Sequence, residues 1–120
     1  MDRTFVLAGA IAGLVAVAFG AFGAHGLRGR LSPEMLAVFE TGVRYQMYHA
    51  LALLLTAALV PRFDGKAIAA AGWLFVTGIV LFSGSLYLLA VTGVTILGAI
   101  TPIGGVAFLA GWASLIVAML

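Results

Sequence analysis

The amino-acid sequence predicts an all-α integral membrane protein, folded as a bundle of four transmembrane helices. Charged residues make up only 8% of the chain and apolar residues 64%, and the mean hydropathy is +1.24. An ordinary soluble domain has about 25% charged residues, which help to cover its surface. Residues 67–120 carry no charged side chain, so this half of the chain predicts two spans joined by an uncharged connection.

The length and the ionisable residues exclude several classes of protein. The 120 residues allow a single domain over 1–120. The absence of cysteine excludes disulfides, thiolate metal sites and cysteine nucleophiles. The net charge of +2 comes from basic residues that are dispersed along the chain, which is not a nucleic-acid-binding pattern. The partners that we expect are therefore membrane lipids, and no protein partner can be named.

The first half of the chain predicts two spans. Residues 4–23 form the first, since about twenty apolar residues match the thickness of the hydrocarbon core. A cleaved secretory signal is the weaker alternative, because the apolar region is long and the leading MDR is barely basic. Residues 45–60 are short for a crossing, but Ser32 and the proline and acid after it are a helix start signal. We therefore favour one long helix over 33–60, with a separate interfacial helix before Arg44 as the alternative.

The second half predicts two further spans. After a short polar turn, PRFDGK, residues 67–92 form the third. Thr101 as N-cap, with a proline in the first turn, opens the fourth over 102–120. The linker 93–100 is apolar for a loop, so we expect it to dip into the interface or to form a short re-entrant piece. Trp112 is too deep in its span for an interface anchor, and we expect it in the core or facing lipid.

Positive charges barely distinguish the two ends of this bundle. The end with the termini carries Arg3, Arg62 and Lys66, and the other end carries Arg28, Arg30 and Arg44. If Arg44 lies inside the bundle rather than in a loop, it does not count, and the positive-inside rule then places both termini in the cytoplasm by a small margin. The expected location is the cell (inner) membrane, with several passes.

Small residues form a seam along the first span. Gly9, Gly13, Ala16, Gly20 and Gly23 recur every three or four positions, which places them on one side of a helix. Gly78 marks a similar position on the third span. Such a seam lets a second helix come close. Packing within the bundle is the favoured explanation, and a homo-oligomer through this glycine seam is the alternative.

The polar residues of the second span share one half of a helical wheel. This half carries Glu40, Thr41, Arg44, Tyr45, Tyr48, His49 and Thr56, while Gln46 stands apart. We expect these side chains to face the inside of the bundle, with Arg44 and His49 among them and Glu40 paired with Arg44. Hydroxyls on the third span and a histidine at the end of the first are the possible partners. The candidate site residues are His25, Glu40, Arg44, Tyr45, Gln46, Tyr48, His49, Ser83, Ser85 and Tyr87.

Two functions are compatible with this polar face. It can be a packing network of a non-enzymatic structural, scaffold or accessory protein. Alternatively, it can line a cavity that binds or conducts a small ligand, a proton or an ion, with His25, Tyr45, His49 and Ser85 in its wall. His25, Glu40 and His49 are possible metal ligands by type, but no ligand spacing supports a metal site. No catalytic motif is visible, so we expect neither an enzyme nor a cofactor.

Four motifs, in order, resemble a known family. They are GAFGAHGL over 20–27, YQMYHALAL over 45–53, GWLFVTGIVLFSGSLYLL over 72–89 and ITPIGGVAFLAGW over 100–112. Together they resemble the small bacterial inner-membrane proteins typified by YgdD and YwdK, a family of unknown function with eukaryotic transmembrane relatives. The resemblance covers nearly the whole chain and implies a four-span membrane protein. It implies no activity, substrate or cofactor.

Overall fold

The protein is a bundle of helices, as the composition predicts. The computed structural model describes residues 2–63 and 65–120, so Asp64 of the expected polar turn lies outside the described residues. The elements in chain order are α1 (Asp2–His25), α2 (Pro33–Leu59), α3 (Lys66–Gly78), the π-helical turn η1 (Ile79–Ser83), α4 (Gly84–Thr92), the 3-10 helix η2 (Thr95–Ala99) and α5 (Thr101–Met119). No strand occurs in these ranges, and α3, η1 and α4 follow one another without a break.

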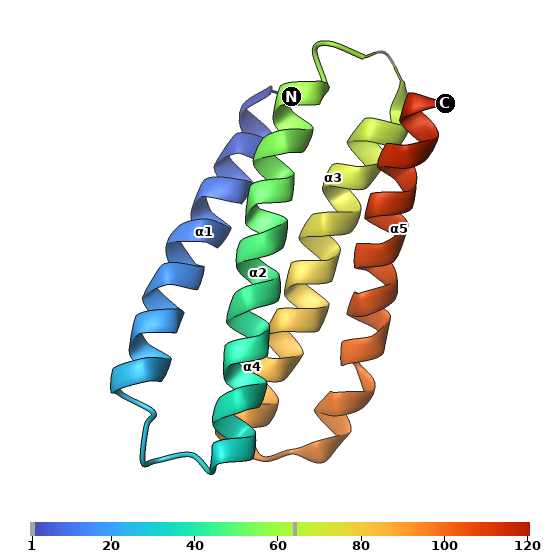
Figure 1. The fold of residues 1–120 in the computed structure, drawn as a ribbon. Coiled ribbons are helices and arrows are strands. Elements are labelled where there is room, and N and C mark those ends of the chain that lie inside the picture. The colour runs from blue at the N-terminus through green and yellow to red at the C-terminus, as the bar shows by residue number, and fades with distance from the viewer. Residues whose placement is uncertain (1, 64) are drawn as a thin grey trace.

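The long helices run alternately up and down (Figure 1). Both termini and the connection from α2 to α3 lie at one end of the bundle, which is the upper end of the figure. The connections 26–32 and 93–100 lie at the opposite end. Helix α2 is central, because it packs against α1 on one side and against α3, η1 and α4 on the other, while α5 packs chiefly against α3 and η1.

Three helical segments are long and apolar enough to cross a membrane. They are Arg3–His25, Lys66–Thr92 and Thr95–Met119. Helix α2 is as long as these at 27 residues, but its first half carries Glu34, Glu40 and Arg44 and it is not among the three. The all-α membrane bundle is thereby confirmed, and α2 is its least apolar member.

Local sequence signals explain where α2 and α5 begin. Ser32 caps α2, since its hydroxyl accepts a hydrogen bond from the Met35 amide at 3.2 Å, and a proline occupies the first turn. A single helix therefore covers Pro33–Leu59, as favoured, and the alternative of a separate interfacial helix before Arg44 is not formed. Thr101 does not cap α5 as expected. It lies within the first turn of that helix, and its hydroxyl contacts Ser85 instead.

Glycines let the helices approach closely. A side-chain carbon at Gly9 would come within 2.9 Å of the Ala50 carbonyl, and one at Gly23 within 3.1 Å of the Phe39 ring. Gly13 and Gly20 also face α2, so the seam on α1 is occupied within the chain. Gly78, the last residue of α3, leaves room for the Phe108 ring of α5.

Candidate functional site: a polar and aromatic network around α2

Gln46 connects three helices. Its side chain is 4% exposed. The amide Nε2 donates to the Ala12 carbonyl of α1 at 2.8 Å, and Oε1 accepts from the Tyr87 hydroxyl of α4 at 2.7 Å. The helical wheel set Gln46 apart from the other polar residues because it points toward α1 and α4 rather than toward α5. Tyr87 is half-buried and packs against Phe19 and Phe39, with ring centroids 5.0 Å from each.

His49 is held by both of its ring nitrogens. It is also 4% exposed. The Trp112 Nε1–H of α5 donates to His49 Nε2 at 3.0 Å, and His49 Nδ1 lies 2.7 Å from the Tyr45 carbonyl. An indole nitrogen can only donate, so Nε2 must be the acceptor, and the ring proton is on Nδ1, which donates to Tyr45. The imidazole is therefore neutral and fixed as one tautomer.

Aromatic rings fill the space between α2 and α5. The His49 ring stacks on Phe108 with centroids 3.6 Å apart and an interplanar angle of 7°. Tyr45, Phe75, Phe82 and Trp112 surround this pair, with neighbouring ring centroids 4.7–6.4 Å apart. Such stacked and tilted ring contacts favour a single packing arrangement. Beside them lies a groove of about 410 Å³, whose wall is almost entirely aromatic and aliphatic.

Serines connect the third span to its neighbours. Ser83, at the end of η1, donates to the Gly42 carbonyl of α2 at 2.7 Å. Ser85 donates to the Phe82 carbonyl at 2.9 Å and lies 2.6 Å from the Thr101 hydroxyl of α5. Since Ser85 has one hydroxyl proton, Thr101 is the donor of the second bond. A π-helical turn inserts one extra residue into a helix, and Ser83 ends this one.

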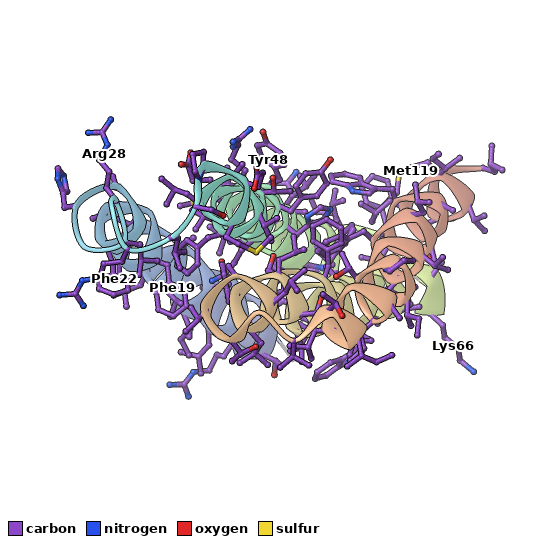
Figure 2. All side chains as sticks on the ribbon, turned by 90° about the horizontal axis from the view of Figure 1, so that it is seen from below. Phe19, Phe22, Arg28, Tyr48, Lys66 and Met119 are labelled. Atoms are coloured by element: carbon purple, nitrogen blue, oxygen red, sulfur yellow. The ribbon has the colours of Figure 1, made fainter. Side chains whose placement is uncertain are left out.

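The charged part of the polar face lies outside the bundle, contrary to the expectation. The side chain of Arg44 is 60% exposed and that of Glu40 is 50% exposed, with 3.9 Å between Arg44 Nη2 and Glu40 Oε2. Tyr48 is 54% exposed, and Figure 2 shows it directed away from the neighbouring helices. The wheel identified the polar half of α2, but the buried stripe of that helix includes only His49 and Thr56 from this half and continues through Gln46. The prediction that Arg44 faces inward is therefore wrong, and that for His49 is correct.

His25 and His49 do not share a cavity. His25 is exposed at the end of α1 and lines a separate cavity together with Arg28, Glu40 and Arg44. Tyr45 and His49 line the aromatic groove, and Ser85 is bonded to Thr101. The single cavity lined by His25, Tyr45, His49 and Ser85 is thus not formed. Among the side chains of residues 3–63 and 65–120, no group of three His, Cys, Asp or Glu is placed to hold a metal ion.

Sequence reasoning missed two members of this site, Phe108 and Trp112. Trp112 was expected in the core or toward lipid, without a role at His49. Both residues lie in a helix that is apolar on every side, so no pattern distinguishes the side that meets α2. A tryptophan deep in a span was the one available signal, because a buried indole N–H needs an acceptor.

Comparisons with known proteins agree with this architecture. The family model "Protein of unknown function (DUF423)" matches residues 19–105. The UPF0382 membrane protein YwdK of Bacillus subtilis is 54% identical over 117 residues, which cover 97% of this chain and 95% of the relative. UPF0382 membrane proteins of Staphylococcus epidermidis and Staphylococcus aureus are 51% and 48% identical, over 98% and 97% of this chain and 96% and 94% of the relatives.

No solved structure matches the chain. The relatives carry the word membrane in their names, and neither the names nor the family description states an activity. The match to the family model and to relatives over nearly the whole chain, together with the helical bundle and its three apolar spans, identifies this chain as a member of the DUF423 family of membrane proteins of unknown function.

Proposed function

We propose that this protein is a non-enzymatic structural or accessory protein of the cell (inner) membrane, whose interior polar groups hold its helices in one arrangement. One observation carries the proposal. Every buried side-chain nitrogen and oxygen within residues 3–63 and 65–120 has a hydrogen-bond partner in the protein itself. A network that is paired throughout stabilises and specifies a fold, whereas a binding or conducting site keeps groups available to its ligand.

The distribution of these bonds supports a role in packing. Across the interfaces, Gln46 bonds to α1 and α4, Ser83 bonds to α2, Thr101 bonds to α4, and Trp112 bonds to α2. These bonds join α2 to α1, η1, α4 and α5, and α4 to α5, in otherwise apolar contacts. In lipid, where apolar surfaces gain little by meeting one another, such bonds and close glycine packing determine which helices associate.

The same geometry argues against proton or ion conduction at His49. Its two ring nitrogens are hydrogen-bonded to Tyr45 and Trp112, and one face of its ring is covered by Phe108. A relay histidine must exchange protons with a neighbouring acid, base or water. The groove next to it is lined by aromatic and aliphatic side chains, which do not stabilise an ion. Catalysis is disfavoured for the same reason, because the buried histidine and serines are engaged by structural bonds.

Replacement of His49 by alanine distinguishes a packing role of this residue from a role in proton conduction. His49→Ala removes the ring that stacks on Phe108 and leaves the Trp112 N–H without an acceptor, so we expect a loss of about 2–3 kcal/mol in detergent stability. The proton permeability of proteoliposomes, measured with an entrapped pH-sensitive dye, should stay at that of the wild type. A variant that keeps its stability but changes the proton flux would contradict the proposal.

The charges support an orientation with both termini in the cytoplasm. Arg44 lies outside the bundle, so the condition under which the sequence excluded it is not met, but it belongs to α2 rather than to a connection and is left out of the loop charges for that reason. The connections and termini then carry Arg3, Arg62 and Lys66 at one end and Arg28 and Arg30 at the other. Because arginine and lysine in short loops determine orientation, the end with the termini is the cytoplasmic one. That α2 crosses the membrane together with the three apolar spans is part of this proposal.

A further inference from the structure

A cavity of about 340 Å³ lies between the end of α1 and the first half of α2. Four of its lining residues can carry charge, namely His25, Arg28, Glu40 and Arg44. The rest of its wall is apolar and includes Phe39, Val43 and the backbone at Gly20. This cavity takes no part in the hydrogen bonds of the interior, so the proposed packing role leaves it unexplained.

Positive charge exceeds negative charge at its rim. The ion pair recorded among the described residues is that of Arg44 with Glu40, which leaves the Arg28 guanidinium free within that part of the chain. Arg28 projects from the connection after α1 to the same side of the molecule as Tyr48 of α2 (Figure 2). Two guanidinium groups against one carboxylate favour an anion, and planar guanidinium groups suit phosphate oxygens in particular.

The depth of the cavity fits a lipid. Helix α1 crosses the membrane and ends at His25, so the rim lies at the level of the lipid headgroups. Val43 and Gly20 are placed toward the bilayer centre from that rim, at about 1.5 Å per residue along their helices. Arg44 follows Val43 along α2, but its guanidinium reaches back to Glu40 Oε2 at 3.9 Å, one turn closer to the rim. The charged groups of the site therefore lie closer to the phosphate level than Val43 and Gly20 do. A free anion would make no use of the apolar wall.

We propose that this cavity binds the phosphodiester headgroup of an anionic phospholipid, with Arg28 and Arg44 on the phosphate and the upper acyl chain against Val43 and Phe19. Glu40 positions Arg44 and opposes the ligand's charge. The carboxyl end of α1 carries a partial negative charge, which also opposes an anion. Binding consequently depends on the two arginines.

Native mass spectrometry of the full chain in detergent, titrated with dioleoylphosphatidylglycerol, tests the site. We expect one tightly bound lipid and at least about tenfold weaker binding of dioleoylphosphatidylcholine, because that lipid has the same phosphate but adds a quaternary ammonium group that the two arginines repel. Arg28→Gln should weaken phosphatidylglycerol binding by a similar factor. Arg30→Gln is the matched control, because Arg30 is exposed in the same connection but does not line the cavity, and it should change the affinity less than about twofold.

Two further variants separate charge from shape. Glu40→Gln should tighten binding of phosphatidylglycerol, because it removes the opposing charge. Ala24→Leu fills the cavity from the exposed side of α1 without altering any charge, and it should weaken binding. Equal weakening by Arg28→Gln and Arg30→Gln, unchanged binding in Ala24→Leu, or equal affinity for the two lipids would overturn the proposal. Displacement of the lipid by equimolar inorganic phosphate would also overturn it, in favour of a site for free anions. None of these results bears on the packing role of His49.

Discussion

The Gln46–Tyr87 hydrogen bond gives the sharpest test of how this bundle is held together. Gln46→Leu keeps the size of the side chain but removes both the bond to the Ala12 carbonyl and the bond from the Tyr87 hydroxyl. An interhelical hydrogen bond in a membrane protein contributes about 0.6 kcal/mol on average and about 1.7 at most. With two bonds lost and the Tyr87 hydroxyl left without its acceptor, we expect Gln46→Leu to cost about 2–3 kcal/mol.

Tyr87→Phe, made alone and together with Gln46→Leu, measures the coupling energy between the two side chains. Tyr87→Phe alone should cost about 1 kcal/mol, because Gln46 loses one partner and keeps the other. In the Gln46→Leu background the hydroxyl has no acceptor there, so its removal should cost nothing or restore some stability. The double-mutant cycle should therefore show a coupling energy of about 1 kcal/mol. The assay is reversible unfolding in mixed micelles with increasing dodecyl sulfate, followed by tryptophan fluorescence.

A matched control comes from the same helix. The Thr41 hydroxyl donates only to the Ala37 carbonyl of its own helix, at 2.9 Å, so Thr41→Val should change stability by less than about 0.5 kcal/mol. Additive effects of Gln46→Leu and Tyr87→Phe, or a cost of Gln46→Leu no larger than that of Thr41→Val, would refute the view that this bond connects α1, α2 and α4.

Two further predictions concern packing and orientation. A side-chain carbon at Gly104 would clash with the Phe82 backbone, whereas one at Gly105 would only touch the Phe82 ring at 3.9 Å. Gly104→Ala should therefore reduce detergent stability by at least about 2 kcal/mol and Gly105→Ala by less than about 0.5 kcal/mol. Similar losses for the two variants in thermal unfolding would contradict the described contact of α5 with η1. The chain has no native cysteine, so single cysteines can report sidedness: in intact cells a membrane-impermeant maleimide should label Arg30→Cys and spare Phe63→Cys, and the reverse pattern would place the termini outside.

The sequence was sufficient for the fold class, because solvent preference alone decides it. A chain with 8% charged residues can only be solvated by lipid. The start of α2 was also predictable, since a serine cap followed by proline is a local signal. The turn η1 was not predictable. A π-helical turn is stabilised by contacts with neighbouring helices, here the Ser83 bond to Gly42, and those contacts have no local sequence pattern.

The candidate site was predicted less well than the fold. The wheel correctly separated the polar from the apolar half of α2, but a wheel does not show where the neighbouring helices lie. Arg44 and Gln46 illustrate this limit. Arg44 was expected inside and lies outside, while Gln46 stood apart on the wheel and connects three helices. The partner of His49 was missed because α5 is apolar on all sides and gives no indication of which residues face α2.

The intermediate polarity of α2 has a consequence for biogenesis. Unlike the segments on either side of it, α2 does not have the hydropathy of an independent span, yet it occupies the centre of the bundle and contacts α1 along most of its length. A segment of this kind partitions poorly from the translocon when it emerges alone. We therefore expect α1 and α2 of the newly made chain to enter the bilayer together as a helical hairpin, in which α1 covers the polar side chain of Gln46.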